Sequence, residues 1–144
     1  MKLSVKLSAL TLALAFSANV FAHGAVTPQA IDTSTIPQLG EEWADTNPYR
    51  DVEGDTKSEI IRVGASAYNQ NCARCHGLEA ISGGIAPDLR YLASDFDGDE
   101  WYVYRVKNGA VRNGAVYMPK MTEHLSQEAL WAVRSFVESV AVAQ

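Results

Sequence analysis

The sequence has few cysteines and histidines and no surplus of basic residues. Its 144 residues include two Cys and three His, and 12 Lys and Arg stand against 17 Asp and Glu, for a formal net charge of −5. A clustered excess of Lys and Arg is the usual mark of a nucleic-acid-binding domain, so that class is disfavoured. With 47% hydrophobic and 20% charged residues, the composition is that of a globular chain and not of a disordered one. The length suits one compact domain.

The first 22 residues have the pattern of a secretory signal peptide. Lys2 and Lys6 form a basic start, residues 7–16 are an apolar stretch, and Ala22 offers a small residue for cleavage before His23. An uncleaved anchor is the alternative, but the apolar stretch falls short of the roughly 18 residues that a membrane span needs. No later segment is apolar enough to span a bilayer. We therefore expect an exported, periplasmic protein that does not span the membrane.

Both cysteines lie in one pentapeptide, Cys72-Ala73-Arg74-Cys75-His76. Two thiols at this spacing can form thioether bonds to the two vinyl groups of one porphyrin, while the adjacent imidazole binds its iron. A redox-active dithiol would need a strand before Cys72, where the sequence predicts a helix. A zinc site needs four ligands and the chain has no second close pair, whereas a plain disulfide leaves His76 unexplained. The pentapeptide predicts a single covalently bound haem c.

The remaining pattern predicts an all-α fold of about four helices, with no strand of convincing length. Residues 23–57 hold three of the five prolines and no sustained period, so we expect an extended, irregular N-terminal arm. Trp43 and Tyr49 are too large and apolar for a free linker, so part of the arm should pack on the domain formed by residues 58–144. The expected elements are a helix capped by Ser58 and ending at Asn71, a short helical turn over 87–92, a helix over 101–108 ended by Gly109, a loop over 109–124, and a helix capped by Ser126 that runs to about Val140.

The sixth iron ligand decides what such a haem can do. An open position binds or activates small molecules, whereas a closed His/Met pair suits electron transfer. Beyond the signal peptide the only methionines are Met118 and Met121, both in the expected loop, and either sulfur can be the ligand. The alternative is that both fill gaps in the core. Because no nucleophile is assembled with a base, we expect an electron-transfer protein and not an enzyme, with an open-site haem sensor or peroxidase as the alternative.

A copper site is a further alternative. Cleavage after Ala22 would make His23 an amino-terminal histidine, which resembles the chelating half of a copper histidine brace. Such a site needs a second free histidine, and with His76 assigned to haem only His124 is left. The strand-rich scaffold of those oxygenases is not expected here, so we disfavour this interpretation.

From Ser58 to Val140 the sequence resembles the class I c-type cytochromes. The matching positions, in order, are Gly64, Tyr68, Cys72, Cys75, His76, Pro87-Asp88-Leu89, Met118-Pro119 and residues 130–136.

That resemblance carries implications for the site. It implies that the first helix crosses closely over the last at Gly64, near Tyr68 and Phe136. It also implies that the carbonyl of Pro87 accepts the imidazole N–H of His76 and that Leu89 packs on the porphyrin. The ligand methionine of the family usually stands directly before a proline, which favours Met118 and leaves Met121 as the alternative.

Further stretches are similar to the PedF-type periplasmic cytochromes, which are electron acceptors of quinoprotein alcohol dehydrogenases that use pyrroloquinoline quinone (PQQ). These stretches are residues 26–30, 39–43, 47–50 and 117–121. The resemblance implies that the chain accepts electrons from such a dehydrogenase and passes them to a downstream oxidase or cytochrome. A general periplasmic shuttle that donates to a terminal oxidase is the alternative.

Charge is distributed unevenly along the chain. Residues 41–59 contain seven acidic and two basic residues, whereas residues 101–122 contain four basic residues and no acidic one. The basic stretch leads into the methionine loop, so we predict a locally basic docking rim on an acidic protein. The alternative is a random scatter of solvated charges. The basic residues are Arg105, Lys107, Arg112 and Lys120.

Overall fold

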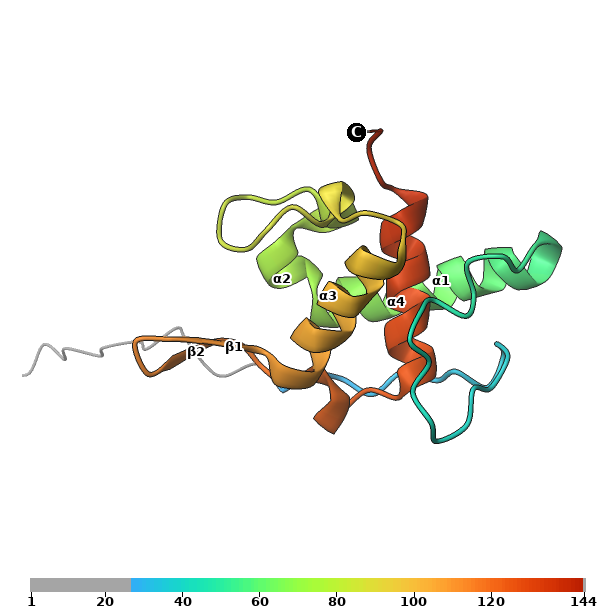
Figure 1. The fold of residues 1–144 in the computed structure, drawn as a ribbon, viewed down its shortest axis with the longest axis horizontal. Helices are drawn as coiled ribbons and strands as arrows, with labels where there is room; N and C mark the ends of the chain where they lie inside the picture. Colours follow the sequence, from blue (N-terminus) through green and yellow to red (C-terminus); the bar gives the residue numbers. More distant parts are fainter. Residues whose placement is uncertain (1–26, 144) are drawn as a thin grey trace, which may run out of the picture.

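The computed structural model describes residues 27–143, so the expected signal peptide and His23 lie outside the described residues. Figure 1 shows helices gathered around α4, with α1 crossing it and a thin hairpin projecting from the end of α3. No helix within 27–143 is long and apolar enough to cross a membrane. The elements are α1 (Gly54–Asn71), α2 (Ala73–His76), α3 (Phe96–Asn108), β1 (Ala110–Arg112), β2 (Ala115–Met118) and α4 (Gln127–Ser139), with 3-10 turns at Leu78–Ala80, Leu89–Tyr91 and Met121–Glu123.

Helix α4 is the central element of the core. All of its residues from Gln127 to Val137 are buried, which is why this stretch of the sequence is apolar over most of its circumference. The hydroxyl of Ser126 accepts a hydrogen bond from the backbone N–H of Ala129 at 3.3 Å, so the expected N-cap is confirmed. Leu125 before the cap and Leu130 after it are both buried.

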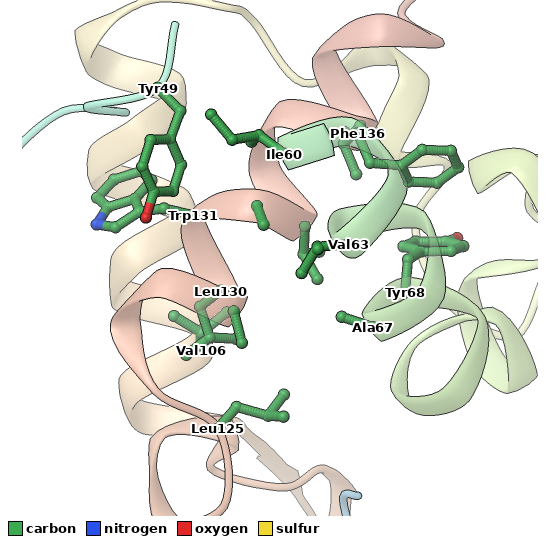
Figure 2. Close-up of a cluster of buried hydrophobic side chains, with 14 of the residues drawn as sticks. Tyr49, Ile60, Val63, Ala67, Tyr68, Val106, Leu125, Leu130, Trp131 and Phe136 are labelled. Atoms are coloured by element: carbon green, nitrogen blue, oxygen red, sulfur yellow. The ribbon is translucent and has the colours of Figure 1, made fainter. Parts of the chain in front are cut away.

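Helix α1 crosses α4 at Gly64, as the resemblance implies. A Cβ built on Gly64 would lie under 3.0 Å from the carbonyl oxygen of Ala132, so only glycine permits this approach of the two backbones. One turn further on, the rings of Tyr68 and Phe136 pack with their centroids 5.1 Å apart (Figure 2). The crossing therefore fixes the end of α1 that leads into the Cys72–His76 pentapeptide.

Two helix starts differ from the expectation. Helix α1 begins at Gly54 and not after Ser58; the ammonium of Lys57 donates to the carbonyls of Tyr49 and Arg50, which holds an extra turn against the arm. Helix α3 begins at Phe96 and not at residue 101, because the carboxylate of Asp95 caps it by accepting from the N–H of Gly98 at 2.9 Å.

The stretch expected as a loop over 109–124 contains an antiparallel hairpin. Strands β1 and β2 are joined by Asn113 and Gly114, whose φ values of 50° and 78° suit a tight two-residue turn. The strands were not expected because each has only three or four residues and the larger apolar side chains Val111, Val116 and Tyr117 stay exposed. The fold is thus mostly helical with one short sheet, and this hairpin corrects the expectation that strands are absent.

Residues 39–50 of the arm run along α4 from its first turn to its last. Near the start of α4, the amide of Gln127 donates to the carbonyls of Gly40 and Glu42, and the carboxylate of Glu128 accepts from the N–H of Leu39 at 3.0 Å. As expected, both large aromatic residues of the arm pack on the domain. Tyr49 is buried in the core (Figure 2), and Trp43 packs on the buried Trp131 with ring centroids 6.4 Å apart.

A buried ionic cluster joins the arm to α3 and α4. Asp99 in α3 and Arg134 in α4 are both fully buried, and the Nε of Arg134 donates to Oδ1 of Asp99 at 2.8 Å. The other carboxylate oxygen of Asp99 accepts from the backbone N–H of Asn47 at 2.9 Å and from the guanidinium of Arg50 at 2.6 Å. Arg50 also donates to Glu138 at 2.6 Å. Three separate segments of the chain therefore meet at one carboxylate.

Candidate haem-binding site

The end of α1 and the single turn of α2 bring the two thiols and the imidazole together. The N–H of Cys72 donates to the carbonyl of Tyr68 at 2.7 Å, and the N–H groups of Cys75 and His76 donate to the carbonyl of Cys72 at 3.1 and 2.9 Å. The two cysteines are not joined by a disulfide. Burial, and to a smaller extent the neighbouring Cys75, raises the pKa of the Cys72 thiol to about 12. Both sulfurs and the imidazole thus stand on one short turn.

The imidazole of His76 is oriented by a backbone carbonyl. Its Nδ1 lies 2.8 Å from the carbonyl oxygen of Pro87, the contact that the resemblance implies. Because a carbonyl oxygen can only accept, Nδ1 carries the proton and the lone pair is on Nε2. A histidine in this state can bind a metal through Nε2 while its other nitrogen is held in place.

The loop that presents Pro87 is stiffened by side chains that the sequence pattern did not mark as site residues. The hydroxyl of Ser82 donates to the carbonyl of Ala86, and the N–H of Ser82 donates to the carboxylate of Asp88 at 3.3 Å. The guanidinium of Arg90 holds Asp88 through two hydrogen bonds, of 3.0 and 2.8 Å, and lowers the pKa of that carboxyl to about 2. Asp88 also caps the following 3-10 turn, and an Asp directly after proline was the signal available for it.

Tyr68 connects the pentapeptide to the core. Its hydroxyl donates to the carbonyl of Gly77, the residue that follows His76, at 2.8 Å. Its ring projects from α1 and packs on Phe136 of α4. Burial raises the pKa of the phenol, which therefore stays protonated. The turn that carries His76 is in this way fixed to the helix crossing.

The two methionines lie in different surroundings. Met118 is the last residue of β2 and is half-buried at the edge of the core. Met121 lies in the following 3-10 turn, is only 4% exposed and belongs to the hydrophobic core. A thioether that is already packed among core side chains is poorly placed to serve as a ligand, whereas one at the edge is available.

The donor set fits a c-type haem. It offers two thiols without a disulfide, an imidazole with Nε2 free, and a thioether at the end of β2. Large apolar side chains also remain exposed in the segment after the pentapeptide, where they would cover an apolar face of the macrocycle. These side chains are Leu78, Ile81 and Ile85.

The described residues give no support to the competing metal sites. Within 27–143, no three His, Cys, Asp or Glu side chains converge so that they could hold a metal ion by themselves. His124, the second histidine that a copper brace would need, is exposed at the end of a 3-10 turn. The zinc and copper interpretations therefore lack a ligand cluster in this part of the chain.

Comparisons with known proteins agree with this geometry. A family model described as "Cytochrome C oxidase, cbb3-type, subunit III" matches residues 59–137. Cytochrome c550 of Pseudomonas aeruginosa is 62% identical over 130 residues, which cover 90% of this chain and 88% of that protein. The quinohemoprotein alcohol dehydrogenase ADH-IIG of Pseudomonas putida is 46% identical over 44 residues, 31% of this chain and 6% of the dehydrogenase. The chloroplastic cytochrome c6 of Chlamydomonas reinhardtii is 34% identical over 82 residues, 54% of this chain and 52% of that protein.

No solved structure matches the chain significantly. The family model nevertheless covers more than half of the chain, and cytochrome c550 matches nearly all of it. The members that match along a comparable length are small electron-transfer proteins, and the family implies a covalently bound c-type haem. This chain therefore belongs to the cytochrome c family and is an electron-transfer protein that carries one haem c.

Proposed function

We propose that this chain is a periplasmic electron carrier that accepts electrons from a PQQ-dependent alcohol dehydrogenase. The observation that carries the electron-transfer site is the joint geometry of the Cys72–His76 turn and the carbonyl of Pro87, 2.8 Å from Nδ1 of His76. The dehydrogenase as donor is supported by the similarity to a short part of ADH-IIG and of ADH IIB of Pseudomonas putida. Where a dehydrogenase includes a segment like this chain, a separate chain of the same kind can take the same electrons.

Four side chains would hold the haem. Cys72 and Cys75 would form the thioether bonds, and Nε2 of His76 and the sulfur of Met118 would bind the iron. Support for Met118 over Met121 comes from burial, because Met121 is packed in the core and Met118 is at its edge. When bound, the haem supplies a one-electron Fe(III)/Fe(II) couple.

The surrounding residues hold this donor set still. The carbonyl of Pro87 keeps the proton on Nδ1 of His76, and the Asp88–Arg90 pair stiffens the loop from which that carbonyl projects. Leu89, buried in the same loop, would pack on the porphyrin. A rigid ligand set changes little between two charge states, which is the requirement for fast electron transfer.

The proposed docking surface consists of Val111, Val116, Arg112 and Lys120. Strand β1 pairs with β2 so that Ala110 lies opposite Met118 and Val111 lies opposite Val116. Because paired residues share a face, the two valines lie side by side on one face of the hairpin. Val111 is 64% exposed and Val116 is 68% exposed. An exposed apolar pair of this kind supports a docking role.

Basic side chains border this apolar pair. The guanidinium of Arg112 stacks over the ring of Tyr117, 5.5 Å from its centroid, and Lys120 is exposed just beyond β2. Of the four basic residues in the predicted rim, Lys107 is instead held over the ring of Trp43 in the arm, at 4.4 Å. The surface therefore suits a partner protein that offers carboxylates around an apolar centre.

The ligand assignment is tested on the haem-loaded protein by the near-infrared absorption band that reports a bond between thioether sulfur and ferric iron. Met118→Ala should lose this band and Met121→Ala should keep it. The opposite pattern would transfer the assignment to Met121. Rapid binding of carbon monoxide by the unmodified reduced protein would instead support the open-site sensor or peroxidase.

The partner is tested by stopped-flow mixing of the oxidised protein with a purified PQQ-dependent alcohol dehydrogenase reduced by its alcohol. At low salt, Lys120→Glu or Arg112→Glu should slow haem reduction several-fold, because steering by charge raises association rates. Reversal of Glu41 or Glu42 to Lys, also at exposed positions, is the matched control and should slow it less. Equal effects at all four positions would contradict the docking surface. Absence of haem reduction by the dehydrogenase would favour the general shuttle to a terminal oxidase.

A further inference from the structure

Gly109 ends α3 in a backbone conformation that other residues do not adopt. Its φ is 66° and its ψ is −154°, a region that is essentially limited to glycine. The residue is buried, and its N–H closes the helix by donating to the carbonyl of Arg105 at 2.7 Å. From the sequence, Gly109 is expected because glycine commonly ends a helix. The structure shows a second reason for a glycine at this position.

The backbone of Met118 and Pro119 lies directly against Gly109. A Cβ built on Gly109 would fall under 3.0 Å from the carbonyl oxygen of Met118, and 3.0 and 3.1 Å from the carbonyl carbon and oxygen of Pro119. The next residue, Ala110, pairs with Met118 across the hairpin. The end of α3 and the end of β2 therefore touch at a place where there is no room for a side chain.

Helix α3 is itself a fixed support. The hydroxyl of Tyr102 donates to the carbonyl of Leu130 at 2.6 Å, and Asp99 is paired with the buried Arg134. Both contacts lead to α4. Because Met118 and Pro119 pack against the end of α3, their position is fixed by the core and not by the exposed hairpin.

We propose that Gly109 is a positioning residue for Met118. The absence of a side chain at Gly109 lets the Met118-Pro119 backbone seat on the end of α3, and this seat sets the reach of the Met118 sulfur. The proposal rests on the proposed role of Met118 as the iron ligand. This role differs from that of a glycine that only ends a helix or makes a turn, because such a glycine needs a positive φ but no contact with Met118 and Pro119.

Gly114 provides the matched control. It also has a positive φ, of 78°, but a Cβ on Gly114 would meet nothing within 4 Å. Both glycines belong to the same hairpin segment. The comparison therefore accounts for the cost of a positive φ, and the insertion variants described below separate the contact with Met118 and Pro119 from the backbone conformation that is particular to Gly109.

The experiment compares Gly109→Ala and Gly114→Ala in the full, haem-loaded protein. Gly109→Ala should lose most of the near-infrared band and bind carbon monoxide at least tenfold faster in the reduced state, while its far-UV circular dichroism stays unchanged. Gly114→Ala should stay within twofold of the unmodified protein in both measurements. An intact band in Gly109→Ala, or equal losses in the two variants, would overturn the proposal.

A second pair of variants avoids the steric clash, in case Gly109→Ala does not fold. One glycine inserted between Gly109 and Ala110 moves Met118 away from its seat, whereas one glycine inserted after Gly114 only lengthens the exposed turn. The first insertion should lose the band and the second should keep it, and the reverse result would also overturn the proposal. Failure of the ligand assignment is distinguishable, because Met118→Ala would then retain the band.

Discussion

Replacement of Asp99 by asparagine should destabilise the protein far more than the loss of an ion pair on its surface. The carboxylate is fully buried and accepts from the side chains of Arg134 and Arg50 and from the backbone N–H of Asn47. Asp99→Asn removes the negative charge and turns one acceptor into a donor that faces other donors. Arg134, also fully buried, then keeps only Glu138, at 3.5 Å, as a counter-charge.

The magnitude follows from the burial of the pair. Removing one partner of a buried ion pair costs about 3–5 kcal/mol, because the other charge stays in a low-dielectric environment without compensation. In a domain of this size that corresponds to a fall in melting temperature on the order of 10–20 °C. The ion pair between Glu59 and Arg62 is a suitable control, since it lies on the exposed surface of α1, and Glu59→Gln should leave stability unchanged within error.

Urea unfolding of the haem-loaded protein, followed by tryptophan fluorescence and far-UV circular dichroism, measures the difference. Adding Arg134→Met to Asp99→Asn should recover part of the loss, because a buried cation is then replaced by an apolar side chain of similar length. A loss below about 1 kcal/mol for Asp99→Asn would refute the reasoning, since it would mean that water reaches the cluster and screens it.

Three further outcomes are expected. Gly64→Ala should lower the free energy of unfolding by about 1–3 kcal/mol in urea titrations, because the new Cβ meets the backbone of Ala132. Met121→Ala should cost about 2–5 kcal/mol as a core cavity yet leave the near-infrared band in place, and loss of the band would contradict our assignment. Arg90 lowers the pKa of Asp88 from 3.8 to about 2, so the stabilisation from this pair is complete above the higher value and is lost as the pH falls through the lower one. Asp88→Asn should remove this acid dependence, which urea unfolding of both proteins over a range of pH values checks.

Local patterns in the sequence predicted the elements whose determinants are local. Ser126 and the apolar run behind it mark α4 correctly, because a cap and its helix are adjacent in the chain. The start of α1 was misplaced because the extra turn depends on a tertiary contact of Lys57 with the arm. The hairpin carried a usable signal in Asn113-Gly114, the dipeptide typical of tight hairpin turns, but its strands lack the alternation that would have supported it.

The same distinction applies to the candidate site. Cys72, Cys75 and His76 are contiguous, so their chemistry can be inferred from spacing alone. A choice between Met118 and Met121 needs their burial, which depends on packing that one sequence does not specify. The cluster around Asp99 joins residues that are 35 to 52 positions apart, and no local pattern indicates that they meet.

The position of α4 in the chain constrains how the protein is made. This helix is the middle of the core, yet it follows in sequence every other element that it contacts, including the arm and α1. During synthesis, α1 lacks the helix that it crosses at Gly64 until residues 127–137 have emerged. We expect the chain to complete its core only when α4 is present. The thiols of Cys72 and Cys75 are therefore accessible for haem attachment before the core has formed.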